Sequence, residues 1–273
     1  MLRQRVLTVA VVLPLFLAAL FLLSNPYWGV LMAGAALVAG LEWGKLAGYS
    51  RAARALFCAV LLASCGTILW WEQGSSATRA FIYSPAGTLL YGAAAVFWLV
   101  IVPAWLVYRW AVRSAWILGV VGCIVLLPFW HALVALQSVP GRLFLALGVV
   151  WIADTAAYFA GRRWGRRKLA PEISPGKTWE GVWGALAAVV LYWIAACVLL
   201  PEMHFFSGLA WVLLMTLLSV EGDLFESWMK RVAGVKDSGQ LLPGHGGLLD
   251  RVDGLTATLP LAALYFAYPL TGS

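Results

Sequence analysis

Residues 115–136 read AWILGVVGCIVLLPFWHALVAL, a run that contains no Asp, Glu, Lys or Arg. A helix needs roughly 20 consecutive apolar residues to cross the hydrocarbon core of a bilayer, so this run predicts a transmembrane helix. The same pattern recurs along the chain and predicts about nine spans, at residues 6–24, 27–44, 55–72, 86–108, 115–136, 143–161, 181–200, 205–221 and 255–270. The expected fold class is therefore an all-α polytopic membrane protein.

The composition of the whole chain supports this fold class. Of its 273 residues 63% are apolar and 11% are charged, and the mean hydropathy is +0.87. A soluble domain averages about 45–50% apolar and about 25% charged residues, so a soluble protein is excluded. The first apolar run, Val6 to Leu23, is longer than the roughly 7–15 residues of a signal-peptide core, and we expect it to be retained as the first span.

The basic residues are distributed unevenly between the two sides of the predicted membrane. With a cytoplasmic N-terminus, every Lys and Arg except Arg79 and Arg142 falls on the cytoplasmic side. The positive-inside rule expects this asymmetry in a bacterial inner-membrane protein. An odd number of spans then places the C-terminus in the periplasm. The net charge of +7 is thus explained by topology, and nucleic acid is not expected as a partner.

Two polar stretches, 162–180 and 222–254, interrupt the apolar pattern, and the topology places both in the cytoplasm. We expect an N-terminal region of about five spans at residues 1–140 and a catalytic region of about four spans at residues 141–273. The active site is expected to face the cytoplasm.

The second polar stretch, together with Glu221 just before it, carries half of the chain's 12 acidic residues. Residues 221–254 read EGDLFESWMKRVAGVKDSGQLLPGHGGLLDRVDG and also contain four Lys or Arg side chains. Charges of both signs next to the hydrocarbon boundary are costly unless they pair or bind a ligand. A loop that only joined two spans could be far shorter, so this stretch is the main candidate for a functional site.

The spacing within this stretch brings polar groups together. Asp223, Ser227 and Lys230 are spaced i, i+4 and i+7, so they share one face of a helix. Asp250 and Asp253 are spaced i, i+3 and share a face at the start of the last span. Mg²⁺ typically uses one or two protein carboxylates and completes its coordination with substrate phosphates and water. We therefore expect Asp223 and Asp250 to bind Mg²⁺, with a second cation also possible.

Between these carboxylates, Pro243 opens a turn that cannot be regular helix. Its glycines, Gly244, Gly246 and Gly247, would let backbone N–H groups approach a phosphate closely. His245 could donate a hydrogen bond to a phosphate oxygen or could simply hold the turn. The basic residues of the stretch could neutralise phosphate charge or could be ordinary cytoplasmic anchors; they are Lys230, Arg231, Lys236 and Arg251.

A second group of candidate residues precedes this stretch. Asp154 lies in the sixth span, about 10 Å from its cytoplasmic end at about 1.5 Å per residue. A carboxylate at that depth serves either function or a helix–helix hydrogen bond. Ser174, Lys177 and Thr178 belong to the sequence SPGKTWEG. A Walker A motif would need glycine in place of Pro171 and a preceding strand, so we expect instead an anion site at a helix N-terminus, with Lys177 and Thr178 in its first turn.

Other polar residues in or near the apolar runs carry weaker signals. Glu42 and Lys45 are spaced i, i+3 and are interpreted as an interfacial ion pair. Glu72 falls in an external loop and suggests no function. His131 lies within an apolar run and is expected to be a hydrogen-bonded core residue, not a metal ligand.

Three motifs resemble those of one enzyme family. Residues 227–253 read S-x-x-K-R-x-x-x-x-K-D-x-G-x-x-L-P-G-H-G-G-x-x-D-R-x-D, residues 151–158 read W-I-A-D-T-x-A-Y, and residues 174–181 read S-P-G-K-T-W-E-G. This pattern resembles the bacterial and mitochondrial-type CDP-diacylglycerol synthases (phosphatidate cytidylyltransferases). The C-terminal half carries the resemblance, whereas residues 1–140 share with the family only a series of hydrophobic spans.

The resemblance implies that CTP and phosphatidic acid react, with Mg²⁺, to give CDP-diacylglycerol and pyrophosphate, and that the protein is a homodimer. It favours Asp223 and Asp250 as the metal ligands. It also implies a group of residues around the nucleotide and lipid phosphates, namely Lys230, Arg231, Lys236, Asp237, His245, Arg251 and Asp253.

Such a reaction needs no strong general base, because the second pKa of a phosphomonoester lies near ~6 and the lipid phosphate is already mostly a dianion at neutral pH. We expect direct in-line attack on the α-phosphorus of CTP, promoted by positioning and cations. Two alternatives remain at this point. A CTP-dependent lipid kinase of the dolichol-kinase type would release CDP, and a transporter would place its polar groups near the membrane midplane in repeated halves.

Overall fold

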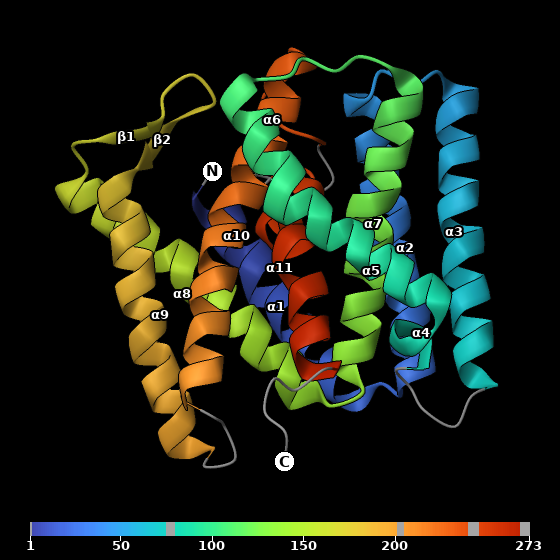
Figure 1. Ribbon diagram of the computed structural model, residues 1–273, viewed down its shortest axis with the longest axis horizontal. Helices are drawn as coiled ribbons and strands as arrows, with labels where there is room; N and C mark the ends of the chain where they lie inside the picture. The colour runs from blue at the N-terminus through green and yellow to red at the C-terminus, as the bar shows by residue number, and fades with distance from the viewer. Residues whose placement is uncertain (1, 75–79, 201–204, 240–245, 268–273) are drawn as a thin grey trace.

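The structure is a computed structural model that describes residues 2–74, 80–200, 205–239 and 246–267. Within them the chain is mostly helical, with one small hairpin. The elements are α1 (Leu2–Leu22), α2 (Asn25–Leu46), α3 (Arg51–Gln73), α4 (Ala80–Tyr83), α5 (Pro85–Val96), the π-helix η1 (Phe97–Ile101), α6 (Val102–Tyr108), α7 (Ala115–Gln137), α8 (Pro140–Trp164), β1 (Lys168–Ala170), β2 (Ser174–Thr178), α9 (Trp179–Leu199), α10 (Phe205–Val232) and α11 (Leu249–Ala267). Figure 1 shows α8, α9 and the hairpin on one side, α2, α3 and α7 on the other, and α10 and α11 between them.

Each predicted apolar span overlaps a helix of the structure, with α5, η1 and α6 together forming the fourth. Seven of the described helical segments are long and apolar enough to cross a membrane: α2, α3, the run from Pro85 to Tyr108, α7, α8, α9 and α10. An all-α polytopic membrane protein is therefore the correct class. The exact number of spans and the sides on which the termini lie stay predictions.

The fourth span contains an irregular turn that supports α10. Residues 97–101 form the π-helix η1, and Pro103 follows at the start of α6. A wide turn of this kind re-aims the side chains around it. Phe97, Trp98 and Trp105 all pack edge-to-face against Phe225 of α10, with ring centroids 5.5–5.6 Å apart. Edge-to-face contacts are the favourable geometry for aromatic rings, so this cluster holds α10 where its acidic residues begin.

The N-terminal helices are tied together by buried polar groups. The indole N–H of Trp28 on α2 donates to the Leu133 carbonyl of α7 at 3.0 Å, and the indole of Trp43 donates to the Leu118 carbonyl at 2.9 Å. Because both tryptophans are almost fully buried, each of these indole N–H groups needs such a partner. The two bonds thus fix α2 against α7 along its length.

His131 is fully buried on α7, as the sequence suggests, and it has partners at both ring nitrogens. Its Nδ1 lies 2.7 Å from the Tyr91 hydroxyl of α5, and its Nε2 lies 3.1 Å from Oε1 of Glu72. The expectation that Glu72 lies in an external loop was wrong, because α3 extends to Gln73 and buries the carboxylate. These side chains connect α3, α5 and α7.

The first polar stretch does not form the helix start that the sequence predicts. Residues 174–178 form strand β2, which pairs antiparallel with β1 in the register Lys168 with Thr178. Thr178 has extended backbone angles and caps α9 through a hydrogen bond from the Gly181 N–H to its hydroxyl. Lys177 and Thr178 therefore precede the first helical turn. Strands β1 and β2 satisfy each other's backbone hydrogen-bonding groups. The sequence of residues 174–181 alone does not indicate this pairing.

Helix α11 packs against α10 and also against α2 and α7 of the N-terminal region. The C-terminal elements therefore contact the N-terminal spans directly. The division of the chain at residue 140 stays a prediction.

Candidate active site

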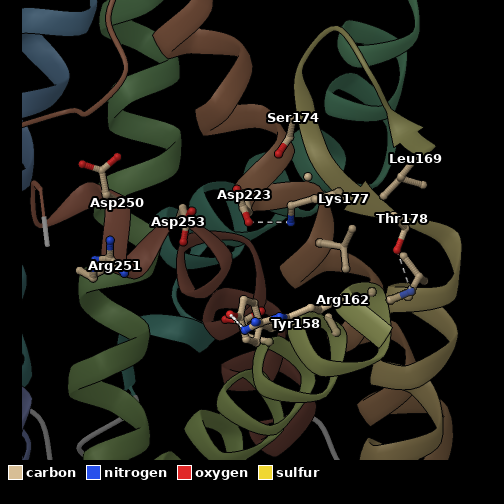
Figure 2. A pocket seen from close by; sticks show the side chains of 17 residues that line it. Tyr158, Arg162, Leu169, Ser174, Lys177, Thr178, Asp223, Asp250, Arg251 and Asp253 are labelled. Carbon is tan, nitrogen blue, oxygen red and sulfur yellow. Dashed lines mark hydrogen bonds and ion pairs between the residues drawn. The ribbon is translucent and has the colours of Figure 1, made fainter. Parts of the chain in front are cut away.

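A cavity of about 560 Å³ lies between α8, α9, the hairpin, α10 and α11. Its walls combine acidic, basic and hydroxyl side chains, as Figure 2 shows. The polar and charged residues that line it are Asp154, Tyr158, Arg162, Ser174, Lys177, Thr178, Asp223, Asp250, Arg251 and Asp253. The two polar stretches and the intramembrane aspartate, far apart in sequence, thus face one space.

Two glycines let α10 and α11 approach closely enough to bring their carboxylates to this cavity. A Cβ atom on Gly222 would lie 2.5 Å from the Asp253 carbonyl oxygen, and one on Gly254 would lie 2.6 Å from the Ser219 hydroxyl. At Gly222 the close neighbour is backbone, so only glycine fits there; at Gly254 the Ser219 carbonyl oxygen also lies close, at 3.2 Å. Asp223 directly follows Gly222, and Asp253 directly precedes Gly254. The close crossing of α10 and α11 therefore sets the spacing of the two carboxylates.

Asp223 is held by two donors from different elements. The ammonium of Lys177, on β2, lies 2.6 Å from its Oδ2, and the Ser227 hydroxyl donates to its Oδ1 at 3.2 Å. The predicted shared face of Asp223 and Ser227 is therefore present. Figure 2 shows Asp223 pointing towards Lys177 across the cavity. This ion pair joins the hairpin to α10 and presents an oriented cation to the cavity.

Asp250 is engaged by four protein donors. Its Oδ1 accepts from the Lys230 ammonium at 2.6 Å, and its Oδ2 accepts from the Ser238 N–H, the Ser238 hydroxyl and the Gly247 N–H at 2.8–2.9 Å. Asp250 lies in the first turn of α11, outside the apolar span. Burial by itself raises the pKa of this carboxyl, but the hydrogen bonds from Lys230, Gly247 and Ser238 outweigh burial and hold the pKa below its ordinary value. The side chain is therefore an anion at neutral pH.

Two further groups face the cavity from α8. Asp154 accepts a hydrogen bond from the Ser219 hydroxyl of α10 at 3.4 Å, so the residue joins two helices and also lines the cavity. Arg162 donates to the Tyr158 hydroxyl at 3.1 Å, one helical turn back towards the apolar part of α8. Its guanidinium therefore lies deeper than the end of the helix, at the edge of the cavity.

Several predicted site residues lie elsewhere. Ser227 and Lys230 donate to Asp223 and Asp250 respectively but do not line the cavity. Gly246 lies beside Asp250 and has a positive φ of 86°. Arg231 donates instead to the Ile173 carbonyl at 3.4 Å. Lys236 and Asp237 line a separate groove with Lys45. Gly244 and His245 lie outside the residues that the structure describes.

Sequence reasoning missed two acidic residues beside the site. Glu226 pairs with Lys230 at 2.7 Å, and Lys230 in turn reaches Asp250. Glu42 does not form the predicted contact with Lys45; it accepts hydrogen bonds from the start of α11. Glu226 could have been found from its i, i+4 spacing to Lys230. Glu42 could have been found by the rule that singled out Asp154, since it too is a carboxylate in an apolar run.

Among the described residues, no group of three or more His, Cys, Asp or Glu side chains could hold a metal ion by itself. Mg²⁺ does not need such a group, because phosphates and water complete its coordination. Asp223 and Asp250 both line the cavity, and Asp250 retains acceptor capacity on Oδ1, which accepts one bond, whereas Oδ2 accepts three. The chemistry of these two carboxylates suits an ion that arrives with a polyphosphate, and that they bind one stays a prediction.

Comparisons with known proteins agree with the resemblance drawn from the motifs. Residues 3–269 match the family described as the cytidylyltransferase family. A phosphatidate cytidylyltransferase of Pseudomonas aeruginosa is 38% identical over 98% of this chain and 98% of its own length. One of Haemophilus influenzae is 34% identical over 99% of this chain and its full length, and one of Brucella suis is 50% identical over 44% of each chain. By this match across nearly its whole length, the chain belongs to the cytidylyltransferase family.

Proposed function

We propose that this protein transfers the cytidylyl group of CTP to phosphatidic acid, releasing pyrophosphate and forming CDP-diacylglycerol for phospholipid synthesis. The observation that carries the proposal is one cavity, beside the membrane spans, in which Lys177, Arg162 and Arg251 face several carboxylates. Family membership and the names of the full-length relatives support the same reaction. They do not favour a lipid kinase or a transporter.

The cavity suits a reaction between two polyanions. The lipid phosphate is the nucleophile and is mostly a dianion at neutral pH, so the site needs cations more than it needs a base. Lys177 is already oriented by Asp223 at 2.6 Å. Arg162 and Arg251 add positive charge around the same space. These side chains would offset the repulsion between the two substrates and the charge that develops as pyrophosphate leaves.

Asp223 and Asp250, the latter through Oδ1, are proposed to hold Mg²⁺. When bound, Mg²⁺ would neutralise triphosphate charge and activate the α-phosphorus towards attack. Asp253 lines the same cavity and is the proposed ligand for a second cation. Ser174 and Thr178 border the same space and would contact phosphate oxygens.

The protein is proposed to reside in the bacterial inner membrane with the cavity facing the cytoplasm, where CTP is found, and to form a homodimer. The uneven distribution of Lys and Arg supports the orientation. Cysteine labelling from either side of the membrane tests the orientation, and light scattering in detergent tests the dimer.

The decisive experiment supplies purified protein with radiolabelled CTP and phosphatidic acid. The expected products are CDP-diacylglycerol and pyrophosphate. CDP with a phosphorylated lipid would identify a kinase and refute the proposal. Asp223→Ala should lose at least ~10²-fold in kcat, because it removes the partner of Lys177 and a metal ligand. Glu172→Ala is the matched control, since its carboxylate pairs with Arg109 outside the cavity.

A further inference from the structure

Glu42 is a buried carboxylate on α2, far in sequence from the residues of the cavity, and only 3% of the residue is exposed. Its Oε1 accepts from the Leu248 N–H at 3.0 Å, and its Oε2 accepts from the Leu249 N–H at 2.8 Å. Both donors lie at the start of α11. The N-terminal spans thus supply an acceptor for the segment that carries Asp250.

The chemistry of these donors explains why an acidic residue occupies this position. The first N–H groups of a helix have no acceptor within the helix, and they carry partial positive charge. A carboxylate offers one oxygen to each N–H group and gains from the helix dipole. An amide at residue 42 would offer one oxygen and one NH₂ group, and the NH₂ group would face an N–H donor.

The surroundings of the carboxylate are built closely around it. A Cβ atom on Gly239 would overlap the Glu42 carboxylate, and a Cβ atom on Gly247 would lie 2.7 Å from both of its oxygens. These glycines lie before and after residues 240–245, which fall outside the described part of the chain. Glu42 therefore lies against Gly239 on one side of this gap and against the start of α11 on the other.

Ser238 connects Glu42 to Asp250. Its hydroxyl oxygen lies 2.9 Å from Asp250 Oδ2 and 3.3 Å from Glu42 Oε2. One hydroxyl has one proton to donate, and the shorter distance favours Asp250. Glu42 accepts the N–H groups of Leu248 and Leu249, and the Ser238 hydroxyl lies between Glu42 and Asp250. The position of Glu42 therefore affects the position of Asp250.

We propose that Glu42 is a positioning residue for cytidylyl transfer: it fixes the start of α11 so that Asp250, Arg251 and Asp253 face the cavity. The measurement of kcat in this test rests on the proposed function. The proposal requires only that losing one of these two accepted hydrogen bonds, with an NH₂ group facing the other N–H, loosens the first turn of α11. A misplacement of about 1 Å can cost ~10²-fold in rate.

The test is Glu42→Gln in the full-length protein in detergent. We expect kcat to fall by ~10- to 100-fold at a temperature well below the unfolding midpoint. Hydrogen–deuterium exchange should become faster in peptides that cover residues 238–239 and 246–253, and remain unchanged in peptides of α3 and α9. Gly239→Ala should act in the same way, because its methyl group displaces the carboxylate from the other side. A role confined to global stability would not produce this local pattern of exchange.

Two control variants match these changes. Glu72→Gln alters another buried carboxylate of the N-terminal spans, which pairs with His131 of α7, and should leave kcat and the exchange of residues 246–253 unchanged. Gly34→Ala alters a glycine of α2 that has no neighbour within 4 Å of the added methyl.

Wild-type kcat in Glu42→Gln, or faster exchange spread evenly over all helices, would overturn the proposal. Failure of the wild-type protein to make CDP-diacylglycerol would refute the proposed function instead. The exchange experiment would still decide whether Glu42 holds the start of α11.

Discussion

Gly222 lies where α10 meets α11, and Gly222→Ala tests whether the spacing of these helices controls activity. The added Cβ would lie 2.5 Å from the Asp253 carbonyl oxygen and 3.2 Å from the Ala257 Cβ. Ordinary contact begins at 3.4 Å, so the helices must separate by about 3.4 − 2.5 = 0.9 Å at this point. Because the clash is with backbone, no side-chain rotation relieves it.

Two opposing terms determine the effect of Gly222→Ala on stability. Overpacking costs about 1–3 kcal/mol, whereas alanine in place of glycine gains about 1 kcal/mol of helix propensity. The net loss should be about 0–2 kcal/mol, so the protein should still fold. A shift of 0.9 Å between Asp223 and Asp253 should nevertheless lower kcat by ~10²-fold. Activity should therefore fall much further than stability.

The assay compares kcat for CDP-diacylglycerol formation with the thermal unfolding midpoint in detergent. Gly66→Ala on α3 is the matched control, because its added methyl meets nothing within 4 Å, and it should retain wild-type kcat. A Gly222→Ala protein with kcat within twofold of wild type would refute the claim that this crossing sets the distance between the carboxylates.

Three further predictions concern the charges of the site. Lys177→Ala should lower kcat/KM for CTP by ~10²-fold in a steady-state assay, because it removes an oriented cation. Lys45→Ala, which changes a residue of the separate groove, should leave kcat/KM unchanged. Equal effects of the two changes would contradict the assignment of Lys177. Lys230→Met leaves the Glu226 and Asp250 carboxylates without their shared cation and should destabilise the protein by about 3–5 kcal/mol, measured by unfolding in detergent; an unchanged midpoint would show that these carboxylates do not depend on Lys230. Chelation by EDTA should abolish turnover and added Mg²⁺ should restore it, while full activity in EDTA would remove the proposed metal.

Much of the fold could be predicted from the sequence because a bilayer imposes a simple rule on length and polarity. Runs such as 115–136 and 181–200 have to be helical to satisfy their backbone groups in hydrocarbon, and the structure has helices there. The same rule marks the polar exceptions. Asp154, Asp223 and Asp250 stand out because charged groups within or next to the hydrocarbon region are costly unless they pair or bind a ligand, and all three line one cavity.

The local form of the polar stretches could not be predicted in the same way. Residues 174–178 could have started a helix, but pairing with β1 satisfies their backbone groups and leaves Lys177 free to reach Asp223. The close crossing at Gly222 is likewise invisible in the sequence, because a glycine in a helix has no partner until two helices pack.

The sequence by itself determined that this is a membrane protein with its polar chemistry in two stretches, because apolar length and charge spacing are properties of the chain alone. Only the tertiary structure decided which carboxylate does what. Asp223 faces Lys177 in the cavity, Asp250 is held by Lys230, Ser238 and Gly247, and Glu42 accepts hydrogen bonds from the start of α11. Such roles depend on hydrogen-bond donors up to about 200 residues away in sequence, and a carboxylate has no role until packing selects its donors.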